Sequence, residues 1–168
     1  MRQFAAAAAC AFFLAGCQST SAPPPLVAFK AQEAAFVHKV GAARIEGQAF
    51  LVLPGGESRL AAGETVRLVP ATAYARARIA HLYKGRKFVR AADIPDVPAP
   101  AQYVENTRST TASSGGRFQF DDVAPGSYFV VTQKIYRSEG SLTPQGGAMY
   151  ESVTIRGAET AKLVVFGR

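Results

Sequence analysis

The sequence predicts an all-β protein: a seven-stranded antiparallel β-sandwich with a partly helical, basic insertion between its second and third strands. The 15 glycines and 10 prolines lie between short apolar runs, which favours strands and turns over helices. Residues 110–132 read as strand, turn, strand, turn and strand: TTASSGGRFQFDDVAPGSYFVVT. The chain of 168 residues is long enough for one domain with a proper core. Short strands separated by turns in this way are typical of two antiparallel sheets packed face to face.

An export signal is predicted at the start of the chain, which reads MRQFAAAAACAFFLAGC. Arg2 supplies a cation, an apolar run covers residues 4–14, and small residues close the segment. This run is too short to anchor the chain by spanning a bilayer. Its end, LAGC at residues 14–17, resembles a bacterial lipobox, and in proteins with that motif the cysteine becomes the lipidated N-terminus. We therefore expect a lipoprotein signal peptide over residues 1–16 and lipid on Cys17; the alternative is an ordinary signal peptide with a cysteine near its cleavage site.

Residues 17–39 are predicted to connect the lipid to a folded domain at residues 40–168. The stretch QSTSAPPP at residues 18–25 is polar and rich in proline, so it is expected to form an extended spacer. Residues 26–40 have loose helical spacing that allows a single helical turn at most. Gln18 stands where lipoproteins kept at the inner membrane carry Asp, so the resemblance implies the outer membrane, facing the periplasm. The membrane is thus an expected partner, reached through the lipid.

The first strand is predicted over residues 40–53, where Ile45, Ala49 and Leu51 fall on one face. A second strand follows at residues 64–69, with its apolar residues alternating inward. After the insertion, a third strand is predicted at residues 102–113. Four more strands are predicted: one around Phe118 and Phe120, and three at residues 127–136, 148–155 and 161–166. The strand at residues 127–136 contains a stretch apolar enough to be covered on both faces. For the strand at residues 148–155, the pattern does not decide which face points inward.

The insertion covers residues 70–101, and a structureless loop of this length is uncommon in a compact domain. A helix with Thr72 as its N-cap is predicted over residues 72–83, followed by an irregular, proline-rich return over residues 91–100. One interpretation is a helix whose apolar stripe covers a sheet while its charges face water. The other is contact with acidic headgroups, lipopolysaccharide or a cell-wall polymer, where each cation contributes ~1 kcal/mol near the anionic surface. The cations available for this contact are Arg76, Arg78, Lys84, Arg86, Lys87 and Arg90.

Two short motifs resemble a known family. GRFQF at residues 116–120 and PGSY at residues 125–128 are similar to the G-x-F-x-F…P-G-x-Y signature of carboxypeptidase regulatory-like domains. The resemblance covers residues 43–167 without the insertion, and it implies a sandwich of transthyretin (prealbumin) or immunoglobulin-like type, common in bacterial envelope proteins. It implies little about function, because the matched residues belong to turns and core. The transthyretin-type hydrolases end in Tyr-Arg-Gly-Ser, whereas this chain ends in VFGR, so that activity is not expected.

Residues that could carry catalysis or bind a metal are sparse. Neither His38 nor His81 has a His or Glu at the spacing of a helical zinc pair, and Cys10 is lost with the signal. Asp121 and Asp122 are adjacent, so we expect them to stabilise a turn rather than to act as a pair. No catalytic residue, metal site or cofactor is therefore predicted.

The function predicted from these observations is that of a lipid-anchored envelope module, structural or protein-binding and not enzymatic. The alternative is a binding module for carbohydrate or an anionic polymer that uses the basic insertion. The formal net charge of +7 favours acidic partners, and the predicted export disfavours nucleic acid among them. An envelope protein, a polysaccharide or a lipid headgroup remains as the partner class.

Overall fold

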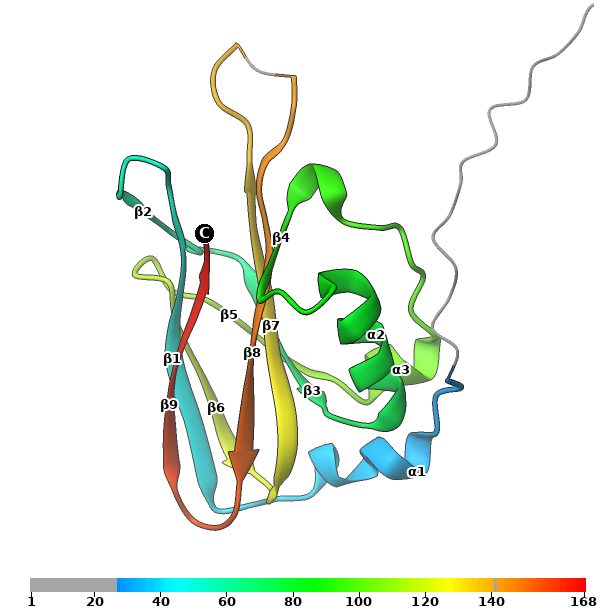
Figure 1. The fold of residues 1–168 in the computed structure, drawn as a ribbon. Helices are drawn as coiled ribbons and strands as arrows, with labels where there is room; N and C mark the ends of the chain where they lie inside the picture. Colours follow the sequence, from blue (N-terminus) through cyan, green and yellow to red (C-terminus); the bar gives the residue numbers. More distant parts are fainter. Residues whose placement is uncertain (1–26, 141) are drawn as a thin grey trace, which may run out of the picture.

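The computed structural model describes residues 27–140 and 142–168; the predicted signal peptide, Cys17 and the spacer at residues 18–25 lie outside this part of the chain. The described chain forms the predicted all-β sandwich. A helical layer covers the outer face of one of its two sheets (Figure 1). None of the described helices is long and apolar enough to cross a membrane.

The four-stranded sheet is built around β1 (Ala43–Val52). Along one side of β1 lies β9 (Thr160–Gly167), which runs parallel to it. Along the other side, β6 (Arg117–Val123) pairs with the first half of β1 and β2 (Ser58–Leu60) with its end, both antiparallel. The predicted antiparallel pairing therefore does not hold for β1 and β9, which are not joined by a hairpin but come from opposite ends of the domain.

The five-stranded sheet has the order β4–β8–β7–β3–β5 and is antiparallel throughout. The long hairpin of β7 and β8 forms its centre and extends beyond the end of the sandwich (Figure 1). The strands are β3 (Thr65–Pro70), β4 (Phe88–Arg90), β5 (Arg108–Thr111), β7 (Gly126–Tyr136) and β8 (Gln145–Ile155).

The described chain contains nine strands, two more than the sequence predicts. β2 and β4 have three residues each, too few for an alternating pattern to emerge. The predicted strand at residues 102–113 is wrong over its first half, where helix α3 (Ala101–Glu105) forms instead. α3 forms here because Pro100 presets the backbone at its N-cap and the Tyr103 ring packs on that of Tyr74, with centroids 5.2 Å apart.

The core between the two sheets confirms the predicted alternation. Ile45 of β1 and Leu68 of β3 are completely buried there. The inward face of β8, which the pattern leaves undecided, is settled by Met149 and Ile155, which point into this core. On β7, Val130 enters the same core while Phe129 packs on the opposite side, so β7 is covered on both faces as predicted.

The N-terminal described segment is more helical than predicted. Helix α1 (Ala31–Ala34) continues directly into the 3-10 helix η1 (Ala35–His38), so the single turn expected at most is exceeded. Phe36 explains the extension, because its ring packs on the buried ring of Tyr128 with centroids 5.3 Å apart.

Asp121 and Asp122 stabilise a bulge rather than a turn. β6 continues past both residues, Asp122 has a φ of 54°, and the pairing with β1 shifts register here. A hydrogen bond from the Gln119 side chain lowers the pKa of Asp121, aided by the guanidinium of Arg44 at 2.7 Å. The acidic pair thus has a structural role, in keeping with the expectation that it is not a reactive pair.

Candidate functional site

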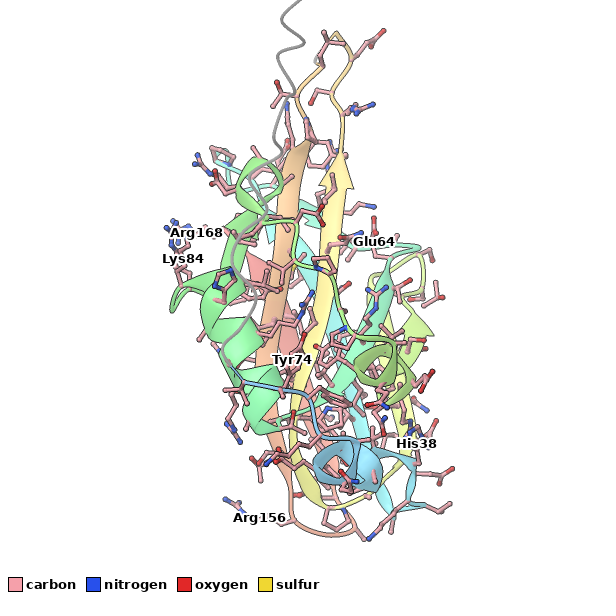
Figure 2. All side chains as sticks on the ribbon, turned by 90° about the vertical axis from the view of Figure 1, so that its right-hand side faces the viewer. His38, Glu64, Tyr74, Lys84, Arg156 and Arg168 are labelled. Carbon is pink, nitrogen blue, oxygen red and sulfur yellow. The ribbon has the colours of Figure 1, made fainter. Side chains whose placement is uncertain are left out.

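The insertion forms most of the helical layer. Its helix α2 (Ala73–Tyr83) begins as predicted, with the Thr72 hydroxyl oxygen accepting a hydrogen bond from the Ala75 amide at 3.2 Å. It ends at Lys84, which adopts the left-handed conformation with a φ of 49°. The chain then forms β4, the 3-10 helix η2 (Ala91–Asp93) and the return to α3. The layer packs on the five-stranded sheet, and Figure 2 shows Tyr74 near its centre and Lys84 at its margin.

The structure separates the six cations predicted to form a binding surface. Arg78 donates hydrogen bonds to the backbone oxygens of Val97 at 2.6 Å and Pro98 at 3.1 Å, so it holds the return segment against α2. Lys87 pairs with Glu151 at 2.6 Å, and its ammonium lies 4.6 Å from the ring centroid of Tyr150. These two cations act within the fold.

The remaining four predicted cations lie in two places. Arg76 is exposed on α2, with its guanidinium 5.9 Å from the Phe129 ring centroid. Lys84, Arg86 and Arg90 surround one hollow at the end of the insertion. Arg90 is paired there with Asp93 at 2.7 Å, whereas Lys84 and Arg86 form no ion pair with the described residues. Only three of the six cations are therefore brought together.

A cleft of about 480 Å³ opens between α2, α3 and the outer face of the five-stranded sheet. We call it the aromatic cleft. Its floor is formed by strands β3, β5 and β7, and its walls by the two helices. It is lined by Thr65, Arg67, Val69, Arg78, Ile79, Leu82, Tyr83, Ala99, Tyr103, Val104, Thr107, Ser109, Val131 and Ala148.

The charge in the aromatic cleft is positive. Arg67 and Arg78 are its only charged lining residues, and no acidic side chain lines it. Arg67 is exposed and forms no ion pair or hydrogen bond through its side chain with the described residues. Arg78 is balanced by carbonyl dipoles rather than by a carboxylate. The field in this partly apolar cleft should therefore attract an anionic group.

Two phenols line the cleft besides its arginines and the hydroxyls of Thr65, Thr107 and Ser109. Burial raises the pKa of Tyr83, and burial also raises the pKa of Tyr103 to about 12 against the opposing charge of Arg78. Neither hydroxyl is hydrogen-bonded to another described residue, yet no fully buried polar side-chain atom in the described chain lacks a partner. Each hydroxyl is therefore at least partly accessible, and both phenols are neutral at physiological pH. Tyr103 and Tyr83 both line the aromatic cleft, and Tyr83 also lines the hollow beside Lys84 and Arg86.

Groups for acid–base or metal chemistry are not assembled in the cleft. Its lining holds no histidine, cysteine or carboxylate, so its side chains cannot supply the paired carboxylates of a glycosidase. His38 lies in η1 and His81 in α2, and the described residues contain no group of three or more His, Cys, Asp or Glu that could hold a metal ion. The arrangement can bind a ligand but offers no nucleophile–base pair.

Two other hollows were weaker candidates. An open groove of about 670 Å³ on the four-stranded sheet contains Glu46 and Lys162, which face each other at 3.7 Å and neutralise each other. A slot of about 460 Å³ at the end of the sandwich is mostly apolar, with Leu51, Phe88 and Tyr136 among its lining residues. The groove also contains Arg117 but no tyrosine, and the slot contains one tyrosine, Tyr136, together with Arg90 and Arg168. The aromatic cleft differs from both because two tyrosines and two arginines line it.

Comparison with known proteins identifies a similar structure. A protein from Pseudomonas aeruginosa that has been suggested to bind carbohydrate is 28% identical, with a TM-score of 0.66; the match covers 83% of this chain and 97% of that one. A minor pilin from Streptococcus agalactiae is 15% identical with a TM-score of 0.39, over 76% of this chain and 44% of the pilin, too loose a likeness to add an argument. No protein-family model and no curated protein matches the sequence.

Sequence reasoning did not find the aromatic cleft. The alternation of residues 64–69 puts Arg67 on the outward side of its strand, but a single outward arginine does not differ from any solvated cation. Tyr83 ends the predicted helix, and the structure buries its ring while leaving it in the lining of the cleft. Tyr103 falls within the strand predicted at residues 102–113, so the sequence does not indicate its place in the wall of the cleft.

Proposed function

We propose that this protein is a carbohydrate-binding module of the bacterial cell envelope, without an enzymatic role, and that the aromatic cleft is its binding site. The observation that carries the proposal is the cleft itself. Apolar side chains converge there with the phenols of Tyr83 and Tyr103 and the guanidinium of Arg67, and the described residues provide no partner for these three groups. The similarity to the suggested carbohydrate-binding protein of Pseudomonas aeruginosa supports it.

A sugar ring suits this lining. Its apolar face can pack on Leu82 and Ile79, while its hydroxyls can accept hydrogen bonds from the phenols of Tyr83 and Tyr103. The volume of about 480 Å³ lies within the range of small-molecule sites. A few polar groups on a largely apolar surface are the usual anatomy of such sites, since they fix the orientation of the ligand.

The predicted anchor would place the cleft beside envelope polymers. We propose that Cys17 carries lipid, that residues 18–25 form a spacer, and that the domain is held at the outer membrane facing the periplasm. We also propose that the sandwich belongs with the carboxypeptidase regulatory-like domains, on the strength of the motifs at residues 116–120 and 125–128. Mass spectrometry of the exported protein tests the anchor, because an unmodified thiol at position 17 contradicts it.

Blocking the cleft tests the binding site. Thr65 is an exposed first residue of β3 and lines the cleft, and Thr160 is an exposed first residue of β9 on the other sheet. The full-length protein should bind some envelope oligosaccharide on a glycan array. We expect Thr65→Trp to weaken this binding at least tenfold and Thr160→Trp to leave it unchanged. Failure to bind any glycan, or equal binding by both variants, refutes the proposal.

A protein-binding role is the second candidate. The outer face of the four-stranded sheet leaves Val164 53% and Phe166 48% exposed, and Phe166 stacks on Phe50 with ring centroids 6.2 Å apart. Exposed apolar patches of this kind often mark protein interfaces. If this face binds an envelope protein, Phe166→Ser should abolish its capture in a crosslinked pull-down; the exposed Leu142→Ser, outside both this face and the aromatic cleft, serves as the control. Identical recovery with both variants counts against this role.

A further inference from the structure

The charge of the aromatic cleft points to the chemical class of its ligand. We propose that the bound saccharide is acidic and that Arg67 binds its anionic group. This inference rests on the proposed function and goes further, because it assigns specificity to a residue on the sheet and not to the basic insertion. The anionic group is a carboxylate, as in a uronic acid, or a phosphate on a sugar.

The backbone holds Arg67 in place. It lies within β3, opposite Ser109 on β5 and Val131 on β7, so strands pair with it on both sides. Its neighbours Val66 and Leu68 point into the core between the sheets, which directs the Arg67 side chain to the face that forms the cleft. Because two strand ladders fix the backbone from which the Arg67 side chain projects, its position is defined more precisely than that of an arginine on a loop.

No acidic side chain neutralises Arg67. The acidic residue nearest to Arg67 in the sequence is Glu64, which immediately precedes β3. Glu64 already forms an ion pair with Lys134 at 3.0 Å. That pair is well protected, with side chains 21% and 19% exposed. The six ion pairs of the described chain leave Arg67 out. The cleft therefore presents a positive charge whose partner must come from outside the described chain.

The chemistry of arginine selects a planar or tetrahedral oxyanion. Its guanidinium donates two parallel hydrogen bonds to a carboxylate or phosphate, and such pairs are stronger than neutral hydrogen bonds. Arg67 and Tyr103 both line the cleft, one from the floor and the other from the α3 wall. A sugar ring held by that phenol would thus bring an acidic substituent within reach of Arg67.

Binding by the full-length chain to matched saccharides tests this inference. The probes are tetragalacturonate, neutral galactotetraose of the same length, and galactose 6-phosphate against galactose. The variants are Arg67→Gln and, as control, Arg117→Gln, because Arg117 is an exposed strand arginine on the outer face of the other sheet and forms no ion pair with the described residues. Because the Arg67 side chain has no ion pair or hydrogen bond with the described residues, Arg67→Gln should unfold at the wild-type temperature, and this measurement excludes misfolding.

We expect the wild type to bind an acidic probe at least tenfold more tightly than its neutral counterpart. Arg67→Gln should remove this preference while keeping the affinity for the neutral sugar, and Arg117→Gln should retain it. The preferred acidic probe identifies the carboxylate or the phosphate as the recognised group. Equal binding of acidic and neutral probes, or a preference that survives Arg67→Gln, overturns the inference and leaves the proposed function standing. Binding of no saccharide overturns both.

Discussion

Replacing Arg78 by alanine should destabilise the protein by about 2 kcal/mol, although the sequence presents Arg78 as one of several surface cations. Its guanidinium donates to the backbone oxygens of Val97 and Pro98, at 2.6 and 3.1 Å, and lies 5.6 Å from the ring centroid of Tyr103. A hydrogen bond from a charged group is worth about 1.5–3 kcal/mol. We assign the lower limit of this range to the half-buried hydrogen bond to Val97, and almost no stabilisation to the exposed hydrogen bond to Pro98. The ring contact adds about 0.5 kcal/mol.

Arg76 provides the matched control. It lies two residues earlier on the same helix, is exposed, and has only a distant contact to Phe129 at 5.9 Å. Arg76→Ala should therefore change the free energy of unfolding by no more than about 0.5 kcal/mol. Arg78→Lys should fall between the two alanine variants, since one ammonium can reach one carbonyl but cannot form the fork.

Urea unfolding followed by tyrosine fluorescence measures these differences, because the chain has 6 tyrosines and no tryptophan. Limited proteolysis of residues 94–100 gives a second readout. In Arg78→Ala this segment should be cleaved faster, since the side chain that holds it against α2 is gone. Equal unfolding midpoints for Arg78→Ala and Arg76→Ala, with unchanged cleavage, would refute the structural role given to Arg78.

Three further predictions concern the turns and the buried groups. Thr72→Ala should lower the free energy of unfolding by about 1 kcal/mol in urea, because it removes the N-cap of α2. Thr72→Ser keeps the capping hydroxyl and should therefore retain most of this stability. Gly116→Ala should cost more than 2 kcal/mol, because φ is 69° and an added Cβ would lie 2.6 Å from the Ala49 oxygen; Gly115→Ala, with no contact closer than 3.9 Å, should be nearly neutral in the same assay. The raised pKa of Tyr83 contributes stability that is fully present below pH 10 and is lost as the pH rises towards the folded value. Because the unfolded phenol is half ionised at pH 10, Tyr83→Phe should reduce the loss of unfolding free energy between pH 10 and 11 by about 1 kcal/mol.

Each of these has a clear contrary outcome. Equal stability of the alanine and serine variants at position 72 would mean that the cap contributes nothing. Equal effects at the two glycines would mean that the left-handed turn is not required. An alkaline unfolding slope that is identical in wild type and Tyr83→Phe would mean that the phenol ionises as easily in the folded protein as in the unfolded chain.

Much of the sandwich could be predicted because its strands obey simple periodicity. The alternation of apolar and polar residues along 45–51 indicates a strand with one buried face. The continuous apolar stretch at residues 127–132 indicates a strand buried on both faces. Thr72 could be identified as an N-cap because a hydroxyl before a helical pattern is a local signal. Features that depend on neighbours a few residues away were therefore accessible.

What escaped prediction depends on contacts between distant segments. The pattern of apolar and polar residues at 102–105 is compatible with a strand. The packing of the Tyr103 ring on the rings of Tyr74 and Phe29 favours a helix instead. β4 has only three residues and exists because it pairs with β8. The cations of the insertion look equivalent in the sequence, and only their partners distinguish the paired Lys87 from the unpaired Lys84.

The position of the aromatic cleft follows from the unequal covering of the two sheets. Because β7 is apolar on both faces, its outer face needs a helical layer, and the insertion supplies one that packs through Val69, Ile79 and Phe129. The helical layer leaves the start of β3 uncovered, so Thr65 and Arg67 are exposed there. The cleft opens at this boundary between the covered and the uncovered part of the sheet. The core between the sheets uses a separate set of side chains. Substitutions at the exposed Thr65 and Arg67 should accordingly alter binding while the sandwich remains folded, which makes the ligand preference measurable on its own.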